Sequence, residues 1–197
     1  MEEQPTYAAF VGENLMASGP LETVLPILKA RFDAGENALV LVFENQTGRQ
    51  VDFDLRGSLA ELIARAAPAP VRTGPGRPRL GVVSREVSLL PSHWEWLEQQ
   101  PNGASATLRR LVDQAARHDP GEQRARRARE ATSRFLTAIA GNLAGYEEAN
   151  RALYRGHSAQ FEEQIRNWPP DIRDHARSLA QDAFIESAAT RSHQTAT

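Results

Sequence analysis

Arginine side chains, which can bind phosphate groups, are concentrated in the middle of the 197-residue chain. Residues 65–134 contain 13 Lys and Arg against 7 Asp and Glu, a net charge of +6, whereas residues 1–64 carry −6 and residues 135–197 carry −2. A basic segment of this kind can meet the phosphates of a nucleic acid, or it can pair with the acidic segments on either side. The charge distribution alone leaves both interpretations open.

Residues 85–115 combine such arginines with the element order of a small DNA-binding motif. The apolar stretch that ends at Leu90 predicts a short strand, the proline after it predicts a helix over 91–100, and Gly103 predicts a turn. Ser105 is expected to cap a second helix. The segment resembles the ribbon-helix-helix family, in which strands of two chains pair into an antiparallel ribbon that enters the DNA major groove.

This resemblance implies roles for individual residues. Val87 and Leu89 would face the core of the dimer, and the backbone N–H groups of Ala106 and Thr107 would bind a phosphate. The sequence departs from the family pattern by one missing residue before Pro91, so either the strand is shifted in register or the segment is only a helical hairpin. An ordinary strand-helix-helix piece packed inside a larger fold is the alternative. The candidate DNA-binding side chains here are Arg85 and Ser88, facing the bases, and Ser105, Thr107, Arg109 and Arg110, near the phosphates.

A second basic feature precedes this segment. The residues Gly76-Arg77-Pro78-Arg79 resemble the core of an AT-hook, in which an extended Arg-Pro stretch lies in a narrow A·T minor groove. Arg77 and Arg79 are therefore further DNA-binding candidates. The alternative is a plain proline-rich hinge.

Few other side chains have the spacing of a catalytic or metal site. The chain has no cysteine, and its five histidines include no H-x-x-x-H pair. Asp52 and Asp54 fall on one face of an expected strand and could form a carboxylate pair, but a polar outer face is the simpler explanation. No phosphate-binding or dinucleotide-binding loop is present. We therefore expect no enzymatic activity, no metal and no cofactor.

The elements around these residues predict an α+β fold. Residues 1–67 read as a small ββαββα unit: two hairpins with turns at Gly12 and Gly48, each followed by a helix, the second of which opens with a Ser58–Glu61 capping box. Residues 68–81 form a Pro/Gly/Arg linker, 82–118 the ribbon-helix-helix-like segment, 119–186 a helical region and 187–197 a disordered tail.

Four stretches together resemble one known family. They are YAAFVGENLMASGPLETV, TGRQVDFDLRGS, VSLLPSHWEWLEQQPNGASATLRRLV, and AGNLAGYEEANRALYRG with the later WPPDIRDHARSLA. The family is the bacterial domain of unknown function 2239. The resemblance implies a cytoplasmic bacterial protein and brings no catalytic residues across.

These observations favour a dimeric DNA-binding protein in the cytoplasm, with transcriptional regulation as the expected role. The partners would be DNA and a second copy of the chain, with no membrane. A non-enzymatic adaptor protein is the first alternative: its small α/β unit, or a surface with a tryptophan, would bind another protein. Trp94 and Trp96 stand two apart and cannot share a helix face, so one is expected in the core and the other at an interface. A small-molecule sensor that holds its ligand between the N-terminal unit and the helices is the second.

Overall fold

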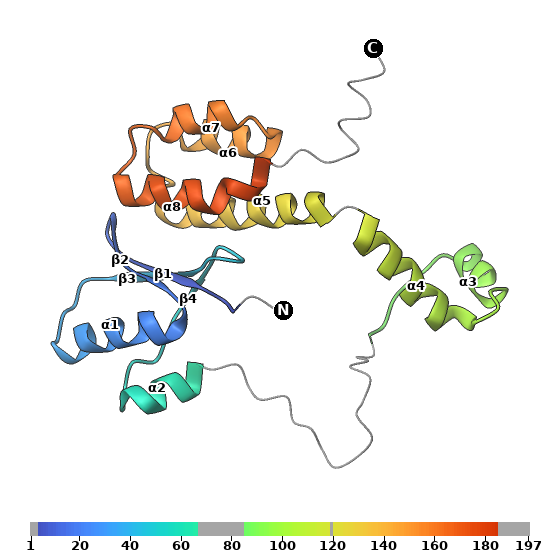
Figure 1. Cartoon of the computed structure of the whole chain (residues 1–197), viewed down its shortest axis with the longest axis horizontal. Helices are drawn as coiled ribbons and strands as arrows, with labels where there is room; N and C mark the ends of the chain where they lie inside the picture. Colours follow the sequence, from blue (N-terminus) through green and yellow to red (C-terminus); the bar gives the residue numbers. More distant parts are fainter. Residues whose placement is uncertain (1–3, 67–84, 119, 185–197) are drawn as a thin grey trace. The chain divides into compact units, whose positions relative to one another are not determined.

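A computed structural model describes residues 4–66, 85–118 and 120–184 of the chain (Figure 1). The fold is α+β, as predicted, with a four-stranded antiparallel sheet followed by a mostly helical region. The described residues form two compact units: one consists of 4–66 together with 121–184, and the other of 85–118. The N-terminal ββαββα segment and the C-terminal helices thus share one unit, although they are far apart in sequence.

The sheet consists of the two predicted hairpins. Strands β1 (Tyr7–Val11) and β2 (Asn14–Gly19) form the first, and β3 (Val40–Glu44) and β4 (Arg49–Val51) form the second. Strand β1 also pairs with β3, which gives the order β2-β1-β3-β4. The second hairpin is shorter than the sequence suggests because β4 ends at Val51, and Asp52 and Asp54 follow it in irregular backbone.

Strand β1 supplies apolar side chains to both faces of the sheet, because successive residues of a strand point to opposite sides. Tyr7 and Ala9 pack in one cluster with residues of α1 (Leu21–Asp33) and α2 (Leu59–Ala66). Ala8 and Phe10 pack in a second cluster with residues of the C-terminal helices. The sheet therefore lies between two helix layers, with α1 and α2 on one side and α5 and α8 on the other (Figure 1).

The C-terminal layer is made of α5 (Pro120–Ile139), α6 (Tyr146–Arg155), α7 (Ser158–Ile165) and α8 (Pro170–Ala180), followed by a short 3-10 helix, η1 (Gln181–Phe184). Pro169 precedes α8 and Pro170 is its first residue, a position that proline favours. The indole N–H of Trp168 donates to the carbonyl of Ala144 at 2.8 Å, so this buried ring keeps its hydrogen bond. The core of this layer includes the buried side chains of Leu153, Phe161, Ile165, Trp168 and Ile172.

Two local features shape this unit: a helix cap at Ser58 and a close contact at Gly48. The capping box is confirmed: the N–H of Ser58 donates to the Glu61 carboxylate at 2.8 Å, and the N–H of Glu61 donates to Ser58 Oγ at 3.3 Å. Gly48, at φ 65°, lies against α5 so closely that a Cβ there would be 1.9 Å from the carbonyl oxygen of Ala131. Only glycine allows the β3–β4 turn to meet this helix.

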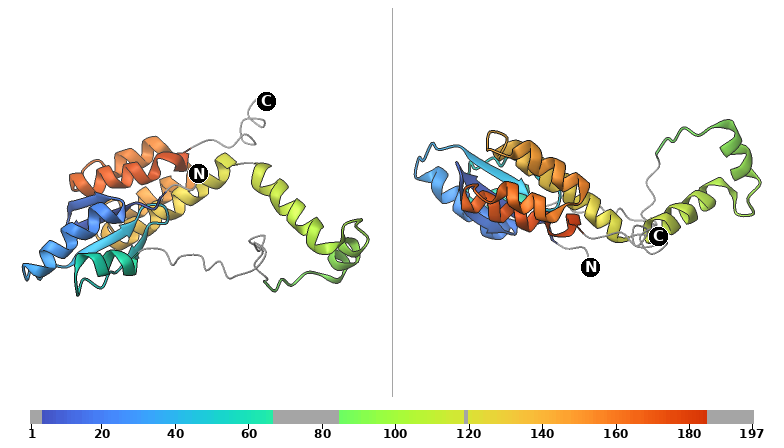
Figure 2. Two further views of the ribbon diagram at one scale, coloured as in Figure 1. Left: turned by 60° about the horizontal axis from the view of Figure 1, so that its bottom comes forward. Right: turned by 90° about the horizontal axis from the view of Figure 1, so that it is seen from above.

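The second unit is a helical hairpin of α3 (Pro91–Glu98) and α4 (Gly103–His118) (Figure 2). Residues 85–90 precede it without regular secondary structure, so the predicted strand is not formed within one chain. Leu90 has extended dihedral angles, φ −66° and ψ 152°, and Pro91 opens the helix as expected. Within the described part of the chain, no helix is long and apolar enough to cross a membrane.

Candidate functional site

The second unit, which consists of residues 85–90 and the helical hairpin, exposes most of its apolar side chains. Among its described side chains only Leu97 and Thr107 are buried. Val87, Leu90 and Val112 are 57%, 62% and 64% exposed. An apolar surface of this kind on so small a unit is typical of an interaction surface. The other large apolar side chains exposed here are Trp94, Trp96 and Leu111.

Both tryptophans of α3 are solvent-accessible. The expectation that one of Trp94 and Trp96 belongs to the core is therefore wrong within a single chain. Trp96 lies one position before the buried Leu97 and therefore on a different side of α3. Trp94 lies three positions before Leu97, near the same side of the helix, yet it is 39% exposed.

The second helix begins earlier than predicted. Helix α4 starts at Gly103, whose φ of 71° makes the turn, so Ser105 lies inside the first helical turn and is not the cap. The backbone N–H groups left free in the first turn of this helix are therefore those of Ala104, Ser105 and Ala106, because the N–H of Gly103 donates to the carbonyl of Gln100 and that of Thr107 lies beyond the first four. The Thr107 side chain is only 4% exposed, so it packs within the hairpin and does not offer its hydroxyl to DNA.

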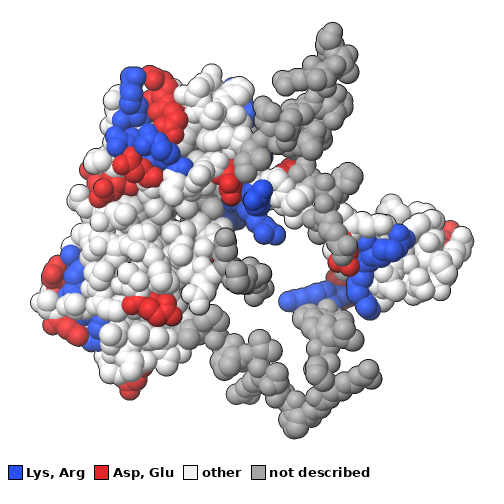
Figure 3. Space-filling model, viewed as in Figure 1, with Lys and Arg blue, Asp and Glu red and all other residues white. Residues whose placement is uncertain are grey.

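The other candidate DNA-binding side chains of residues 85–118 are accessible to solvent. Arg85, Ser88, Ser105, Arg109 and Arg110 are all exposed, and in residues 85–118 no hydrogen bond or ion pair engages the three arginines. Arg109 and Arg110 line a shallow hollow of about 410 Å³ on α4, together with Ala106, Asp113 and Gln114. Basic side chains gather on the face of this hairpin seen in Figure 3.

The two arginines of the predicted minor-groove arm, Arg77 and Arg79, lie outside the described residues. The structure therefore brings Arg109 and Arg110 together on one helix and leaves the arm as a sequence-based prediction.

The larger unit contains a second candidate site, at the place between the N-terminal segment and the helices that the sensor alternative names, but the sequence analysis identified none of its residues. A cleft of about 630 Å³ opens between three elements: the β3–β4 side of the sheet, the first half of α5, and α8 with η1. Thr6, Asn45 and Gln46 form one wall, and the carboxylate of Asp182 lies on another. The remaining lining residues are Ser18, Arg124, Arg127, Ala128, Ala131, His175, Ser178, Leu179 and Gln181.

His175 is the most buried polar side chain of this cleft, with 9% of its surface exposed. Its ring packs on Phe135 and Phe10, with centroid distances of 4.7 and 5.4 Å. Its Nε2 atom has neither solvent contact nor a hydrogen-bond partner among the described residues. Burial lowers the pKa of His175 to about 4, so the imidazole is neutral at pH 7.

The amide side chains of the cleft are held by hydrogen bonds. Asn45 Nδ2 donates to Thr6 Oγ1 at 3.0 Å, and the N–H of Thr6 donates to Gln46 Oε1 at 3.0 Å. Asn45 Oδ1 remains buried and unpaired in this part of the structure. Two of the side chains around the cleft, Asn45 and His175, thus have an unsatisfied polar atom.

The arginines of α5 differ in their contacts. Glu130 accepts from Arg126 at 3.1 Å and from Arg134 at 3.5 Å, so these two arginines pair within the helix. Arg129 Nε donates to the carbonyl of Ala183 at 3.0 Å. Arg124 and Arg127, by contrast, are exposed and line the cleft, and no ion pair or hydrogen bond holds them to another described residue.

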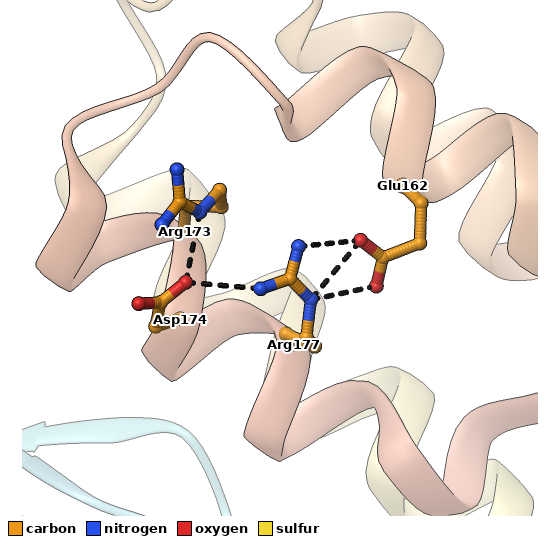
Figure 4. Close-up of polar contacts among 4 residues, drawn as sticks. All are labelled: Glu162, Arg173, Asp174 and Arg177. Atoms are coloured by element: carbon orange, nitrogen blue, oxygen red, sulfur yellow. Dashed lines mark hydrogen bonds and ion pairs between the residues drawn. The ribbon is translucent and has the colours of Figure 1, made fainter.

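Arginines on α8 are held in a network of ion pairs (Figure 4). Arg177 contacts both oxygens of Glu162 on α7, the shortest distance being 2.7 Å, and donates to Asp174 at 3.0 Å. Arg173 donates to the same Asp174 oxygen at 2.8 Å, and this hydrogen bond lowers the pKa of Asp174. Arg177 joins α8 to α7 and Arg173 pairs within α8, so both are engaged, whereas Arg124 and Arg127 are available to a ligand.

One member of the carboxylate pair considered from the sequence, Asp54, is also held internally. Arg56 donates to both oxygens of Asp54, each at 2.8 Å, and these hydrogen bonds lower the pKa of Asp54 below its usual range. Across the described ranges, no three His, Asp or Glu side chains gather as metal ligands do.

Comparison with known proteins identifies the family of the chain. A family model matches residues 6–180, and its description is that of an uncharacterised protein conserved in bacteria, DUF2239. Neither the curated proteins nor the solved structures contain a match to this chain. The match covers well over half of the sequence, and the protein therefore belongs to the DUF2239 family of bacteria.

Proposed function

We propose that this protein binds DNA as a homodimer through its helical hairpin, with transcriptional regulation as its role. The observation that carries the proposal is the exposed apolar surface of residues 85–118, which lies beside arginines without ion-pair partners. A DNA-binding role would place the protein in the cytoplasm, where the bacterial chromosome lies.

The apolar surface supports dimerisation because the hairpin cannot bury it alone. On α4, Leu108, Leu111, Val112 and Ala115 recur at the spacing of one helix face, and Leu111 and Val112 are exposed. A strand with two helices also needs a third layer or a second copy to cover its apolar side. The hairpin of a second chain has the same apolar surface, and in a two-fold dimer the two equal surfaces pack against each other.

The backbone of residues 85–90, before α3, also supports a second copy of the chain as the partner. The backbone of residues 85–89 forms no hydrogen bond within the described part of the chain, and Leu90 is extended. Free N–H and C=O groups on an extended segment are a template for pairing with another strand. Pairing with the equivalent stretch of a second chain would produce the two-stranded ribbon that the sequence suggests.

The proposed DNA-contacting residues are those that remain accessible. Arg85 and Ser88 lie on the extended stretch and would face the bases, while Ser105, Arg109 and Arg110 would meet phosphates. Thr107 is no longer included because its side chain is buried. Arg77 and Arg79 remain proposed contacts of a minor-groove arm.

A salt titration of duplex binding tests this function. The affinity of the full chain for a labelled duplex of about 20 base pairs is measured by fluorescence anisotropy at about 50 and 200 mM salt. If Arg109 and Arg110 of both chains meet phosphates, the affinity falls about 100-fold or more over this range. The variant R109A/R110A then reduces the salt slope by about 3 to 4, since four arginines are lost per dimer.

A matched control removes two arginines from the other unit. Arg151 and Arg155 are exposed on α6, and R151A/R155A changes the net charge of the protein by the same amount. This variant is expected to bind DNA with the wild-type slope. An affinity that is absent, or that does not change with salt, would instead favour an adaptor whose apolar surface binds another protein.

A further inference from the structure

The cleft of the larger unit takes no part in the proposed DNA contact. We propose that it is a binding site for a small molecule that carries a phosphate group, with Arg124 and Arg127 as the phosphate ligands. This inference does not depend on the proposed function, because every residue that carries it belongs to the unit of 4–66 and 121–184.

The two arginines are placed as a pair. They lie three positions apart on α5, so their side chains project from the same side of the helix. Both line the cleft and are without ion pairs among the described residues, in contrast to Arg126, Arg134 and Arg177. Guanidinium groups bind phosphate oxygens through two parallel N–H donors, which makes a free pair of this kind well suited to a phosphate.

The buried wall of the cleft gives independent support. His175 is nine-tenths buried there, and its Nε2 atom is unpaired, as is Asn45 Oδ1. Buried polar atoms in folded proteins almost always have a hydrogen-bond partner, so an unpaired one next to a cavity points to a ligand or to an ordered water. Because Nε2 has no solvent contact, the ring nitrogen that a ligand in the cleft can reach is Nδ1, which in the neutral imidazole serves as either a donor or an acceptor.

The dimensions and charge favour a small molecule over a nucleic acid chain. A volume of about 630 Å³ is within the range of small-molecule sites. Most of the lining residues are polar, as suits a phosphate-bearing ligand, and the apolar ones are Ala128, Ala131 and Leu179. The charged lining residues are two arginines and Asp182, a net charge of only +1. Asp182 forms no ion pair with either arginine within the described ranges, so it is free to accept from a hydroxyl or amino group of the ligand.

The test uses inorganic phosphate as the probe and the full chain as the protein. Imidazole ¹H–¹⁵N signals are recorded by NMR while phosphate replaces chloride at constant ionic strength, and the His175 signals are assigned with H175F. We expect the His175 signals to shift and to saturate with phosphate. In R124A/R127A the dissociation constant should rise about tenfold or more, because two charged hydrogen-bond donors are lost.

R151A/R155A serves as the control, since it removes two exposed arginines of the same unit and should leave the dissociation constant unchanged. The proposal is overturned if the His175 signals do not saturate, or if R124A/R127A binds phosphate as the wild type does. A third titration adds short duplex DNA at the same phosphate concentration. If the duplex shifts the His175 signals, the cleft belongs to a DNA-binding surface and the small-molecule assignment is wrong.

Discussion

Replacing Val112 with Glu should dissociate the proposed dimer without unfolding the hairpin. Val112 is 64% exposed on α4, so a charge at this position has little to disturb within one chain. In a two-fold dimer the same side chain would be covered by the partner. Burying the accessible part of a valine side chain stabilises an interface by about 1 to 2 kcal/mol.

Because each dimer contains the position twice, V112E should cost about 2 to 4 kcal/mol of association free energy. This corresponds to an increase of about 30- to 1,000-fold in the dimer dissociation constant. Sedimentation equilibrium over the micromolar range measures that constant, and circular dichroism confirms that the helix content is retained. The desolvation of the glutamate carboxylate acts in the same direction.

Leu39 provides the matched control for this experiment. It is also an exposed apolar side chain, but it lies in the other unit, in the loop before β3. L39E should therefore leave the dimer intact. The reasoning is refuted if the wild-type chain is a monomer throughout the micromolar range, or if V112E and L39E associate equally well.

Two predictions concern the larger unit. His175 binds its proton near pH 6.5 in the unfolded chain but only near pH 4 in the folded one, so the folded state should lose about 3 kcal/mol as pH falls through this window. H175F should remove that loss in denaturant titrations, and equal pH slopes in the two proteins would contradict the burial of this ring. Gly48→Ala should lower the free energy of unfolding by about 3 to 5 kcal/mol because its Cβ would meet Ala131, whereas Gly12→Ala, also at positive φ but with open space around it, should cost only about 1 to 2. Similar costs for the two alanine variants would show that the contact with Ala131 is not tight.

Local sequence signals predicted the fold of the N-terminal segment correctly. Glycine turns and alternating apolar residues identified both hairpins, and the Ser58–Glu61 capping box identified α2. These signals act over a few residues, so they are readable from the sequence. The start of α4 was misplaced because Gly103 makes the turn itself, and Ser105 is not needed as a cap.

The residues that line the cleft could not be predicted because they come from distant parts of the chain. Asn45, Arg127 and His175 have no common motif and meet only when the helices pack on the sheet. His175 occupies a position on the apolar face of α8, next to the buried Ile172 and Ala176 on that helix. That spacing was the one signal in the sequence that it would be buried.

The stoichiometry of the protein on DNA tests the central proposal most directly. Sedimentation velocity of the full chain with a labelled duplex of about 20 base pairs separates free DNA from complexes containing one or two chains. A homodimeric reader predicts that two chains bind together and that V112E forms no such complex at the same concentration. A complex with a single chain, or duplex that sediments as free DNA throughout, would contradict the proposal.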